Sequence, residues 1–529
     1  MSAASAVARL NARLIRRGVL WLALVIGFFV FVEALTYENT YPDDAARAKL
    51  VAMSDEPALR MLQGVPHAVD TVGGFVAWDA GWMLSAIIGI WAMLVTGRLL
   101  RGEEESGRAE LMQVAPVRAS RIVVLQVAVV AAALAVLGVV TAVILTALGT
   151  GVTGSVVFGA GLAGFGATCA GIAAIAAQLL PVRRRVSAVA TAAFGVFFVL
   201  RMAANSADAR GGLRWATPFG WLDELHAYRD PNWPALLVLL LAPVILFGTA
   251  VRLRRLRDTG GALIAGTDHA RARLRYLGGP TGFAWRTTRG LLLGWLLGVA
   301  AYAYVTGALV ATVLDLIRDD PNYQKTLEAI GWDEADAAGG FIGLMGILIG
   351  LLIALFTCWR IGAAQNEEGT GRLDHVLARP VTRSRWLSGH LLITAAAAVL
   401  IATSAAVAMW AGAASSGADV SLADTLAANL NPLPVVALAC GVAVLLYGAF
   451  PRLTVPGSAA VAVTAYLIEM VGPGLNWPDA ILSISPFHHL ASVPAAPYRP
   501  VAAAVMTAVA LAFILVGHAL FTRRDLTGD

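Results

Sequence analysis

The segment at residues 101–121, RGEEESGRAELMQVAPVRASR, occurs a second time at 365–385 as QNEEGTGRLDHVLARPVTRSR. The two copies lie 264 residues apart and align without a gap. A charged segment that recurs at half the length of a 529-residue chain indicates that the whole chain is a duplication. Eight pairs of positions are identical, and a ninth stays acidic: Glu103 and Glu367, Glu104 and Glu368, Gly107 and Gly371, Arg108 and Arg372, Glu110 and Asp374, Pro116 and Pro380, Val117 and Val381, Ser120 and Ser384, Arg121 and Arg385.

Weaker repeats at similar spacings extend the duplication over the rest of the chain. They are Pro181 with Pro451, Pro218-Phe219 with Pro486-Phe487, and Arg257-Asp258 with Arg524-Asp525.

The composition places both copies in a membrane. Hydrophobic residues make up 58% of the chain, charged residues only 14%, and the mean hydropathy is +0.73, which excludes an ordinary soluble enzyme and a disordered chain. A spanning helix needs roughly 20 apolar residues. Twelve stretches qualify: 18–36, 76–97, 121–148, 155–180, 186–203, 233–251, 290–313, 340–360, 386–413, 433–450, 457–471 and 500–521. We therefore predict an all-α integral membrane protein.

The distribution of charge predicts the orientation. With a cytoplasmic N-terminus, 29 Lys and Arg residues fall inside and 10 outside, as the positive-inside rule requires. Both termini are then cytoplasmic. Each copy holds six spans, an even number, so the copies are parallel and a pseudo-two-fold axis runs along the membrane normal.

Four segments follow from these boundaries. Residues 1–17 are predicted to form an interfacial helix with Val7, Leu10 and Leu14 on one face, although an ordinary basic flank explains its arginines equally well. Residues 18–251 and 290–529 are the two six-span halves. Residues 252–289 form a basic linker whose nine arginines suit a lipid-facing strap better than a nucleic-acid site.

Several chemistries have no basis in the sequence. A phosphate-binding Walker loop needs a lysine after glycines, and neither of the two lysines, Lys49 and Lys325, has that setting, so we expect no ATPase in this chain. Cys169, Cys358 and Cys440 fall in apolar runs and are expected to be packing residues. We find no metal-ligand spacing and expect no metal or other cofactor in the chain.

The repeated segment itself has two interpretations. It reads as a short helix with acids in its first turn, closed by Pro116 or Pro380, in which Arg108 pairs with Glu104. The same charged pattern in both halves favours a shared external contact instead.

This pattern, Glu-Glu-x-x-Gly-Arg followed by Pro-Val-x-x-Ser-Arg just after the second span, resembles the cytoplasmic coupling segment of ATP-binding-cassette type-two exporter permeases. The fused twelve-span form looks like the polyketide antibiotic, or tetronasin-type, transport integral membrane proteins. The resemblance implies a bacterial inner-membrane subunit that exports hydrophobic small molecules, driven by two copies of a separate ATPase that binds ATP and Mg²⁺. The implied coupling residues are Glu103, Glu104, Gly107, Arg108, Glu110, Glu367, Glu368, Gly371, Arg372 and Asp374. Reversing the charge of Glu104 and Glu368 is expected to abolish transport without unfolding the chain.

The resemblance also implies a central cavity bordered by the first, second and fifth spans of each half. Candidate lining residues are Phe28, Trp82, Phe194, Phe198, Trp295, Met345 and Tyr466. The glycines at 159, 161, 164 and 166, and the pairs 339/343 and 346/350, are expected to allow close helix packing.

Two other classes of protein fit the sequence less well. A proton-coupled secondary transporter of the twelve-span facilitator type shares the six-plus-six repeat, but it would place acids or histidines at mid-membrane, where this chain has few. An intramembrane enzyme would need a buried catalytic set, and none is found. The sequence identifies neither the cargo, nor its entry route, nor the ATPase.

Overall fold

The computed structural model describes residues 3–55, 57–108, 118–258, 260–264, 278–319, 334–472 and 477–526. Within these ranges the regular structure is entirely helical, as predicted. The chain divides into two compact units, Met1–Ala270 and Arg271–Asp529. The division falls inside the segment predicted as a linker.

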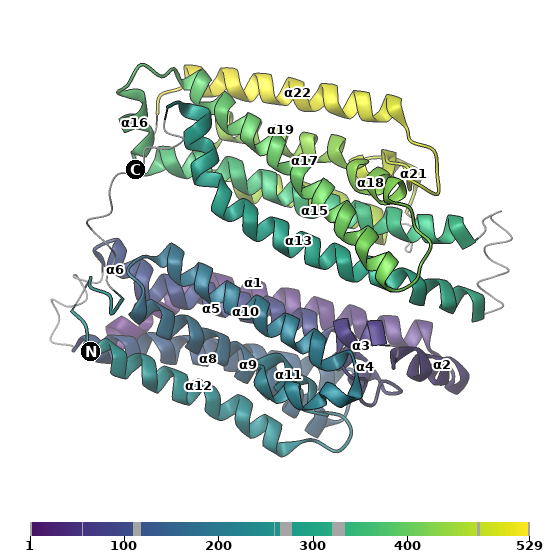
Figure 1. Cartoon of the computed structure of the whole chain (residues 1–529). Helices are drawn as coiled ribbons and strands as arrows, with labels where there is room; N and C mark the ends of the chain where they lie inside the picture. The colour runs from purple at the N-terminus through teal and green to yellow at the C-terminus, as the bar shows by residue number, and fades with distance from the viewer. Residues whose placement is uncertain are drawn as a thin grey trace. The chain divides into compact units, whose positions relative to one another are not determined.

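Unit 1 consists of long helices joined at one end by shorter ones (Figure 1). Its elements are α1 (Ala3–Thr40), α2 (Asp44–Ser54), α3 (Pro57–Gln63), α4 (Val72–Asp79), α5 (Gly81–Gly97), the π-helical turn η1 (Arg98–Gly102), α6 (Glu103–Glu105), α8 (Ala119–Ala147), α9 (Val152–Leu179), α10 (Arg183–Asn205), the 3-10 helix η2 (Asp208–Ala216), α11 (Pro218–Asp223) and α12 (Trp233–Arg254).

Unit 2 repeats this plan. Its elements are α13 (Pro280–Asp319), α15 (Glu334–Gly369), α16 (Arg372–Leu377), α17 (Arg383–Ser415), α18 (Leu422–Leu430), α19 (Leu433–Ala449), η3 (Pro451–Leu453), α20 (Thr454–Val471), α21 (Asp479–Leu482), η4 (Pro486–His489) and α22 (Pro500–Arg523).

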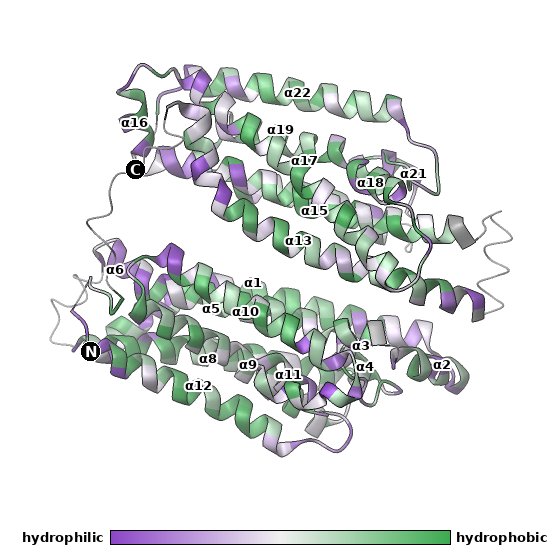
Figure 2. Cartoon of the chain, viewed as in Figure 1, coloured by the Kyte–Doolittle hydropathy of each residue, from purple (hydrophilic) through white to green (hydrophobic). Residues whose placement is uncertain are grey.

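Twelve helical segments of the described chain are long and apolar enough to cross a membrane, six in each unit. Every predicted span coincides with one of them, so the prediction of twelve spans is confirmed. The long helices are hydrophobic along most of their length and carry polar residues toward their ends (Figure 2). This pattern is what a bilayer requires, because apolar side chains face lipid and charged ones reach water.

The same pairs of spans pack together in both units. In unit 1 the fourth span, α9, packs against α5 and α12, and in unit 2 its counterpart α19 packs against α15 and α22. The first and third spans also pair, as α1 with α8 and as α13 with α17.

Glycines let these helices approach closely, as the sequence predicted. A Cβ on Gly159 of α9 would lie 2.3 Å from the carbonyl oxygen of Gly138 on α8. A Cβ on Gly346 of α15 would lie 2.6 Å from the carbonyl oxygen of Ala428. At both crossings a larger side chain would push the backbones apart.

The N-terminal segment is continuous with the first span. Residues 3–40 form one continuous helix, α1, with no break near residue 17. Leu10 and Leu14, predicted to share the apolar face of an interfacial helix with Val7, are 46% and 37% exposed. The buried side chains are instead Val7, Asn11 and Ile15, spaced four residues apart as the helix repeat demands.

The repeated acids also sit differently from the prediction. They are not in the first turn of a new helix but at the end of the second and eighth spans, in α6 and in the last turns of α15. The short helix of the second copy, α16, begins only at Arg372. Residues 109–117 of the first copy lie outside the described residues. Carboxylates at a helix C-terminus oppose the helix dipole, so these acids need cationic partners.

Candidate functional site

The repeated segment of unit 1 ends in a buried ion pair. Both oxygens of the Glu104 carboxylate accept from the Arg257 guanidinium, at 2.8 Å from Nη2 to Oε1 and 2.9 Å from Nη1 to Oε2. Arg257 also donates from Nε to Gln178 of α9, at 2.9 Å. The Glu104 side chain is 8% exposed and that of Arg257 is 2% exposed. The pair therefore fastens the end of the second span to the residues that follow the sixth.

A second arginine extends this contact to the segment after the fourth span. Arg101 donates from Nη1 to Glu104 Oε2, at 2.8 Å, and from Nε to the Pro181 carbonyl oxygen, at 2.8 Å. It also donates to the carbonyl oxygens of Gly260 and Gly261. The ends of spans two, four and six thus meet around one carboxylate.

Unit 2 builds the same contact with different neighbours. Arg524, after the sixth span of this half, donates from Nη1 to Glu368 Oε1 at 2.6 Å and from Nη2 to Oε2 at 2.7 Å. The hydroxyl of Tyr447 in α19 donates to the same carboxylate, at 2.8 Å. The Tyr447 ring lies under the Arg524 guanidinium, 5.4 Å from its centroid. Again the ends of the second, fourth and sixth spans of the half meet.

The first acid of each copy is held differently in the two units. Arg108 forms two hydrogen bonds with Glu103, at 2.8 and 3.1 Å, rather than pairing with Glu104 as the sequence suggested. In unit 2 the corresponding Glu367 lies 3.7 Å from Nε2 of His390, whose Nδ1 contacts Arg360 at 2.8 Å. Glu367 therefore turns toward the interior of its half, whereas Glu103 pairs with its own segment.

A glycine ends the helix at the same place in both copies. Gly107 has φ +73° and Gly371 has φ +68°, a left-handed conformation that costs other residues energy. Their amides donate to the carbonyl oxygens of Glu104 and Glu368, at 3.1 and 2.9 Å. The glycine turn therefore sets the direction in which the segment leaves the long helix.

Only part of the predicted coupling set is open to solvent. Glu103, Glu104, Glu367 and Glu368 are buried or nearly so. Arg372 and Asp374 on α16 are exposed, as is Arg108. Glu110 lies outside the described residues. Reversing the charge of Glu104 or Glu368 is thus expected to destabilise its half, contrary to the sequence-based expectation.

The predicted cavity residues form separate clusters in the two units. In unit 1, Phe194 and Phe198 both pack on Phe219, with ring centroids 5.0 and 5.3 Å away, and Trp82 lies 6.2 Å from Phe198. Phe28 is 70% exposed. Phe219 was not predicted as a lining residue, although its repeat with Phe487 was a usable signal.

In unit 2 the cluster is looser. Tyr466 packs edge-on against Phe487, at 5.8 Å, and the Tyr302 hydroxyl donates to Met345 Sδ at 3.7 Å. Trp295 packs on Phe356 instead, at 5.7 Å. Met345 and Tyr466 therefore both lie near the Tyr302 side chain, whereas the described ring contact of Trp295 is with Phe356.

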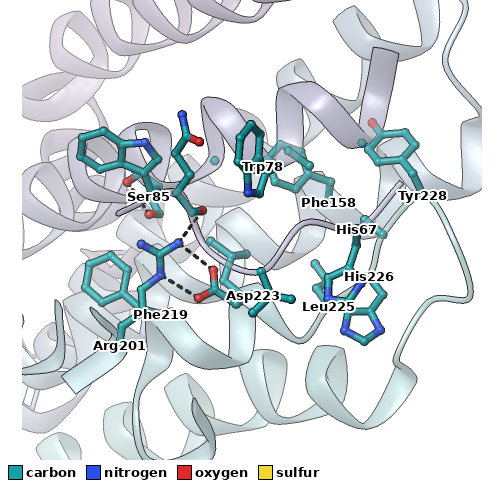
Figure 3. A pocket seen from close by; sticks show the side chains of 18 residues that line it. His67, Trp78, Ser85, Phe158, Arg201, Phe219, Asp223, Leu225, His226 and Tyr228 are labelled. Carbon is teal, nitrogen blue, oxygen red and sulfur yellow. Dashed lines mark hydrogen bonds and ion pairs between the residues drawn. The ribbon is translucent and has the colours of Figure 1, made fainter. Parts of the chain in front are cut away.

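Unit 1 has a pocket beside Trp82, built from α4, α5, α9, α10, α11 and the loops around them (Figure 3). Its polar wall is a buried ion pair in which Arg201 donates to both oxygens of Asp223, at 2.7 and 2.8 Å. Trp78 and Phe158 supply apolar walls. The pocket is partly open, and its cavity volume is about 50 Å³, which has room for a few water molecules but not for a drug-sized compound.

Two histidines lie at this pocket with their rings 3.6 Å apart. Burial, and to a smaller extent the nearby His226, lowers the pKa of His67 to about 4. Burial also lowers the pKa of His226. Both rings are therefore neutral at pH 7. In the described part of the chain, no group of three or more His, Cys, Asp and Glu side chains is arranged to hold a metal ion.

Comparison with known proteins gives the family. The profile of the family described as "Multidrug efflux system permease Rv1217c, C-terminal domain" matches residues 10–254 and 277–522, one stretch in each unit. The multidrug efflux system permease protein Rv1217c of Mycobacterium tuberculosis (strain H37Rv) is 32% identical over 516 residues, covering 96% of this chain and 92% of that protein.

The chain belongs to this family. Together with the twelve apolar helices, membership of the Rv1217c permease family establishes a multi-pass membrane protein that is a transport component. The resemblance drawn from the repeated segment is confirmed at that level.

In this member of the Rv1217c family, the structure gives roles to residues that were not predicted as site residues from the sequence. Arg257 and Arg524 were visible only as a weak repeat, and their partnership with Glu104 and Glu368 needs the fold. Tyr447 carried no signal, because a lone tyrosine in an apolar run looks like a packing residue.

Proposed function

We propose that this chain is the membrane subunit of an ATP-driven exporter for hydrophobic small molecules, including polyketide-type antibiotics. A separate ATPase, present in two copies, binds ATP and Mg²⁺ and supplies the energy. The observation that carries the proposal is the repeated segment, which closes the second span of each half with the same acids and the same left-handed glycine. The family of multidrug efflux permeases supports the class of cargo.

The exposed part of each segment is the contact with the ATPase. On α16 the exposed Arg372 and Asp374 offer a cation and an anion within three residues, which suits a charged, specific docking surface. Arg108, exposed in the first copy, contributes less freely because Glu103 holds it. The two docking contacts are therefore unequal in strength.

The arrangement of charge supports the remaining parts of the proposal. We place the repeated segments and both termini in the cytoplasm of a bacterium, with the protein in its inner membrane, because 29 of the 39 basic residues then face inward. The parallel halves relate by a pseudo-two-fold axis along the membrane normal, which matches a partner of two copies. ATP hydrolysis by that partner switches a central cavity between inward-facing and outward-facing states.

Cargo contacts are assigned to the aromatic and Met side chains of the first, second and fifth spans of each half. The Trp82, Phe194 and Phe198 cluster of unit 1 and the Met345 and Tyr466 pair of unit 2 offer flat, polarisable surfaces, which bind varied apolar compounds without a fixed hydrogen-bond pattern. Phe28 and Trp295 complete the proposed set.

The proposal is tested by co-purification. The chain, expressed with candidate ATPase subunits, should form a complex whose native mass contains two ATPase copies, and hydrophobic compounds should stimulate its ATP hydrolysis. Reversing the exposed charges together, with Arg372→Glu and Asp374→Arg, should weaken the complex while the melting temperature of the permease stays the same. A permease that binds no ATPase and still exports these compounds would refute the proposal.

A proton-coupled secondary transporter remains the second candidate, since its known form shares the six-plus-six repeat. Its signature would be export that stops with a protonophore while ATP is still present.

A further inference from the structure

The ion pairs Glu104–Arg257 and Glu368–Arg524 join parts of the chain that are 153 and 156 residues apart. We propose that these pairs are positioning latches. Each holds the repeated segment of its half against the end of the sixth span, so that a push on the segment moves spans two, four and six together. This role rests on the proposed coupling to an ATPase, and it reassigns Glu104 and Glu368 from docking contacts to internal supports.

Burial keeps the latches closed. The Glu368 side chain is 3% exposed and that of Glu104 is 8% exposed, so neither carboxylate is presented to a partner protein. Opening a latch would leave a buried charge without its partner, which is strongly unfavourable. The contact therefore persists while the segment moves.

The geometry of each ion pair fixes the relative orientation of its two groups as well as the distance between them. Each arginine presents two N–H groups to two carboxylate oxygens in a planar fork, at 2.6–2.9 Å. Such a fork fixes the relative orientation of the two groups, which a lysine ammonium would not do. The Glu104 latch is further fixed by the main chain, since the amides of Leu263 and Ile264 donate to the carbonyl oxygens of Gln178 and Leu179.

The residues around the two latches differ. What the two latches share is the two-pronged contact between an arginine and a carboxylate. Unit 1 adds Arg101 and the Gln178 side chain, whereas unit 2 adds the Tyr447 hydroxyl and ring. In both units, a residue of the fourth span or of the turn after it contacts the glutamate–arginine pair or its neighbouring arginine. If the contact were incidental to packing in one half, the corresponding three spans would not meet in the same way in the other half.

The experiment uses unit 2, where the contacts described for the Glu368 carboxylate are those with Arg524 and the Tyr447 hydroxyl. Spin labels at the exposed positions Thr370→Cys and Arg523→Cys report the distance across the latch in the full-length protein in nanodiscs. The native Cys169, Cys358 and Cys440 are buried and should stay unlabelled. The latch predicts a narrow distance distribution that broadens in Glu368→Gln and returns to its original width in the charge swap Glu368→Arg with Arg524→Glu.

Two further variants are included in case Glu368→Gln does not fold and as a control for removing a charge from the segment. Arg524→Lys retains the charge without the fork, so it should fold and should broaden the distribution even if Glu368→Gln does not fold. Asp374→Asn, the matched control, removes an exposed acid from the same segment and should leave the distribution narrow. An unchanged width in Arg524→Lys, or a swap that stays broad, overturns the latch.

In a separate experiment with the ATPase present, ATPase binding and cargo-stimulated ATP hydrolysis are measured for the same variants. A latch variant should still bind the ATPase with unchanged affinity but should lose cargo-stimulated ATP hydrolysis, and the swap should restore it. Lost binding in Arg524→Lys would make Glu368 a docking contact and would overturn the inference. If the wild-type chain engages no ATPase, the proposed function fails, while the distance measurements still decide whether the latch exists.

Discussion

The crossing of α13 and α17 in unit 2 gives the sharpest prediction about what holds a half together. Gly412 lies where a Cβ would sit 2.0 Å from the carbonyl oxygen of Tyr304, and a Cβ on Gly307 would sit 2.0 Å from that of Met409. Ordinary contact between these atoms needs more than about 3 Å, so Gly412→Ala must move the helices apart by about 1 Å or distort one of them. Overpacking of this kind costs about 1–3 kcal/mol.

The control is Gly298→Ala on α13, the other helix of this crossing. Among the described residues, no heavy atom beyond its own helical turn lies within 4 Å of its Cβ position, so the substitution gains helix propensity of up to about 1 kcal/mol without a clash. Thermal unfolding of the detergent-solubilised protein should therefore show a lower melting temperature for Gly412→Ala and an equal or higher one for Gly298→Ala. Equal melting temperatures for wild type and Gly412→Ala would refute this account of the crossing.

Three further predictions concern the aromatic cluster, the histidine pair and the pocket of unit 1. Phe219→Ala, which removes a side chain that is 2% exposed, should destabilise unit 1 by about 3–5 kcal/mol, and Phe219→Leu by clearly less, as measured by denaturant unfolding. The pKa of His67 is about 4 in the folded chain and 6.5 in the unfolded chain, so the free energy of unfolding should fall as the pH drops from 6.5 toward 4, by at most about 1.4 kcal/mol per pH unit. The substitution His67→Phe should flatten this pH dependence. An unchanged slope in that variant would contradict the argument that burial lowers the pKa. Arg201→Leu leaves Asp223 buried without its cation and should lower the melting temperature more than Arg201→Leu combined with Asp223→Leu; a double variant no more stable than the single one would refute the pairing.

Much of the fold was predictable because the bilayer imposes a simple rule. Apolar runs of about 20 residues had to become spans, and all twelve did. Glycines such as Gly159 pointed to close crossings for the same reason, since only a missing side chain lets two backbones meet.

The candidate site was less predictable, because its contacts join distant positions. The sequence marked Glu104 and Glu368 as special, yet acids after a span look the same whether they face a partner or an internal arginine. Their burial depends on Arg257 and Arg524, which follow the sixth span and lie more than 150 residues away. The helix end was also misplaced: the long second span continues through the acids because the arginines offset the unfavourable dipole at its C-terminus.

The most direct test of the account is transport into inverted membrane vesicles that contain the chain with its ATPase, with ATP supplied and a protonophore added. We predict that a hydrophobic dye accumulates in the vesicles, and that accumulation stops when the ATPase is left out or its hydrolysis is blocked. Accumulation by the chain alone, driven by a proton gradient and abolished by the protonophore, would contradict the account.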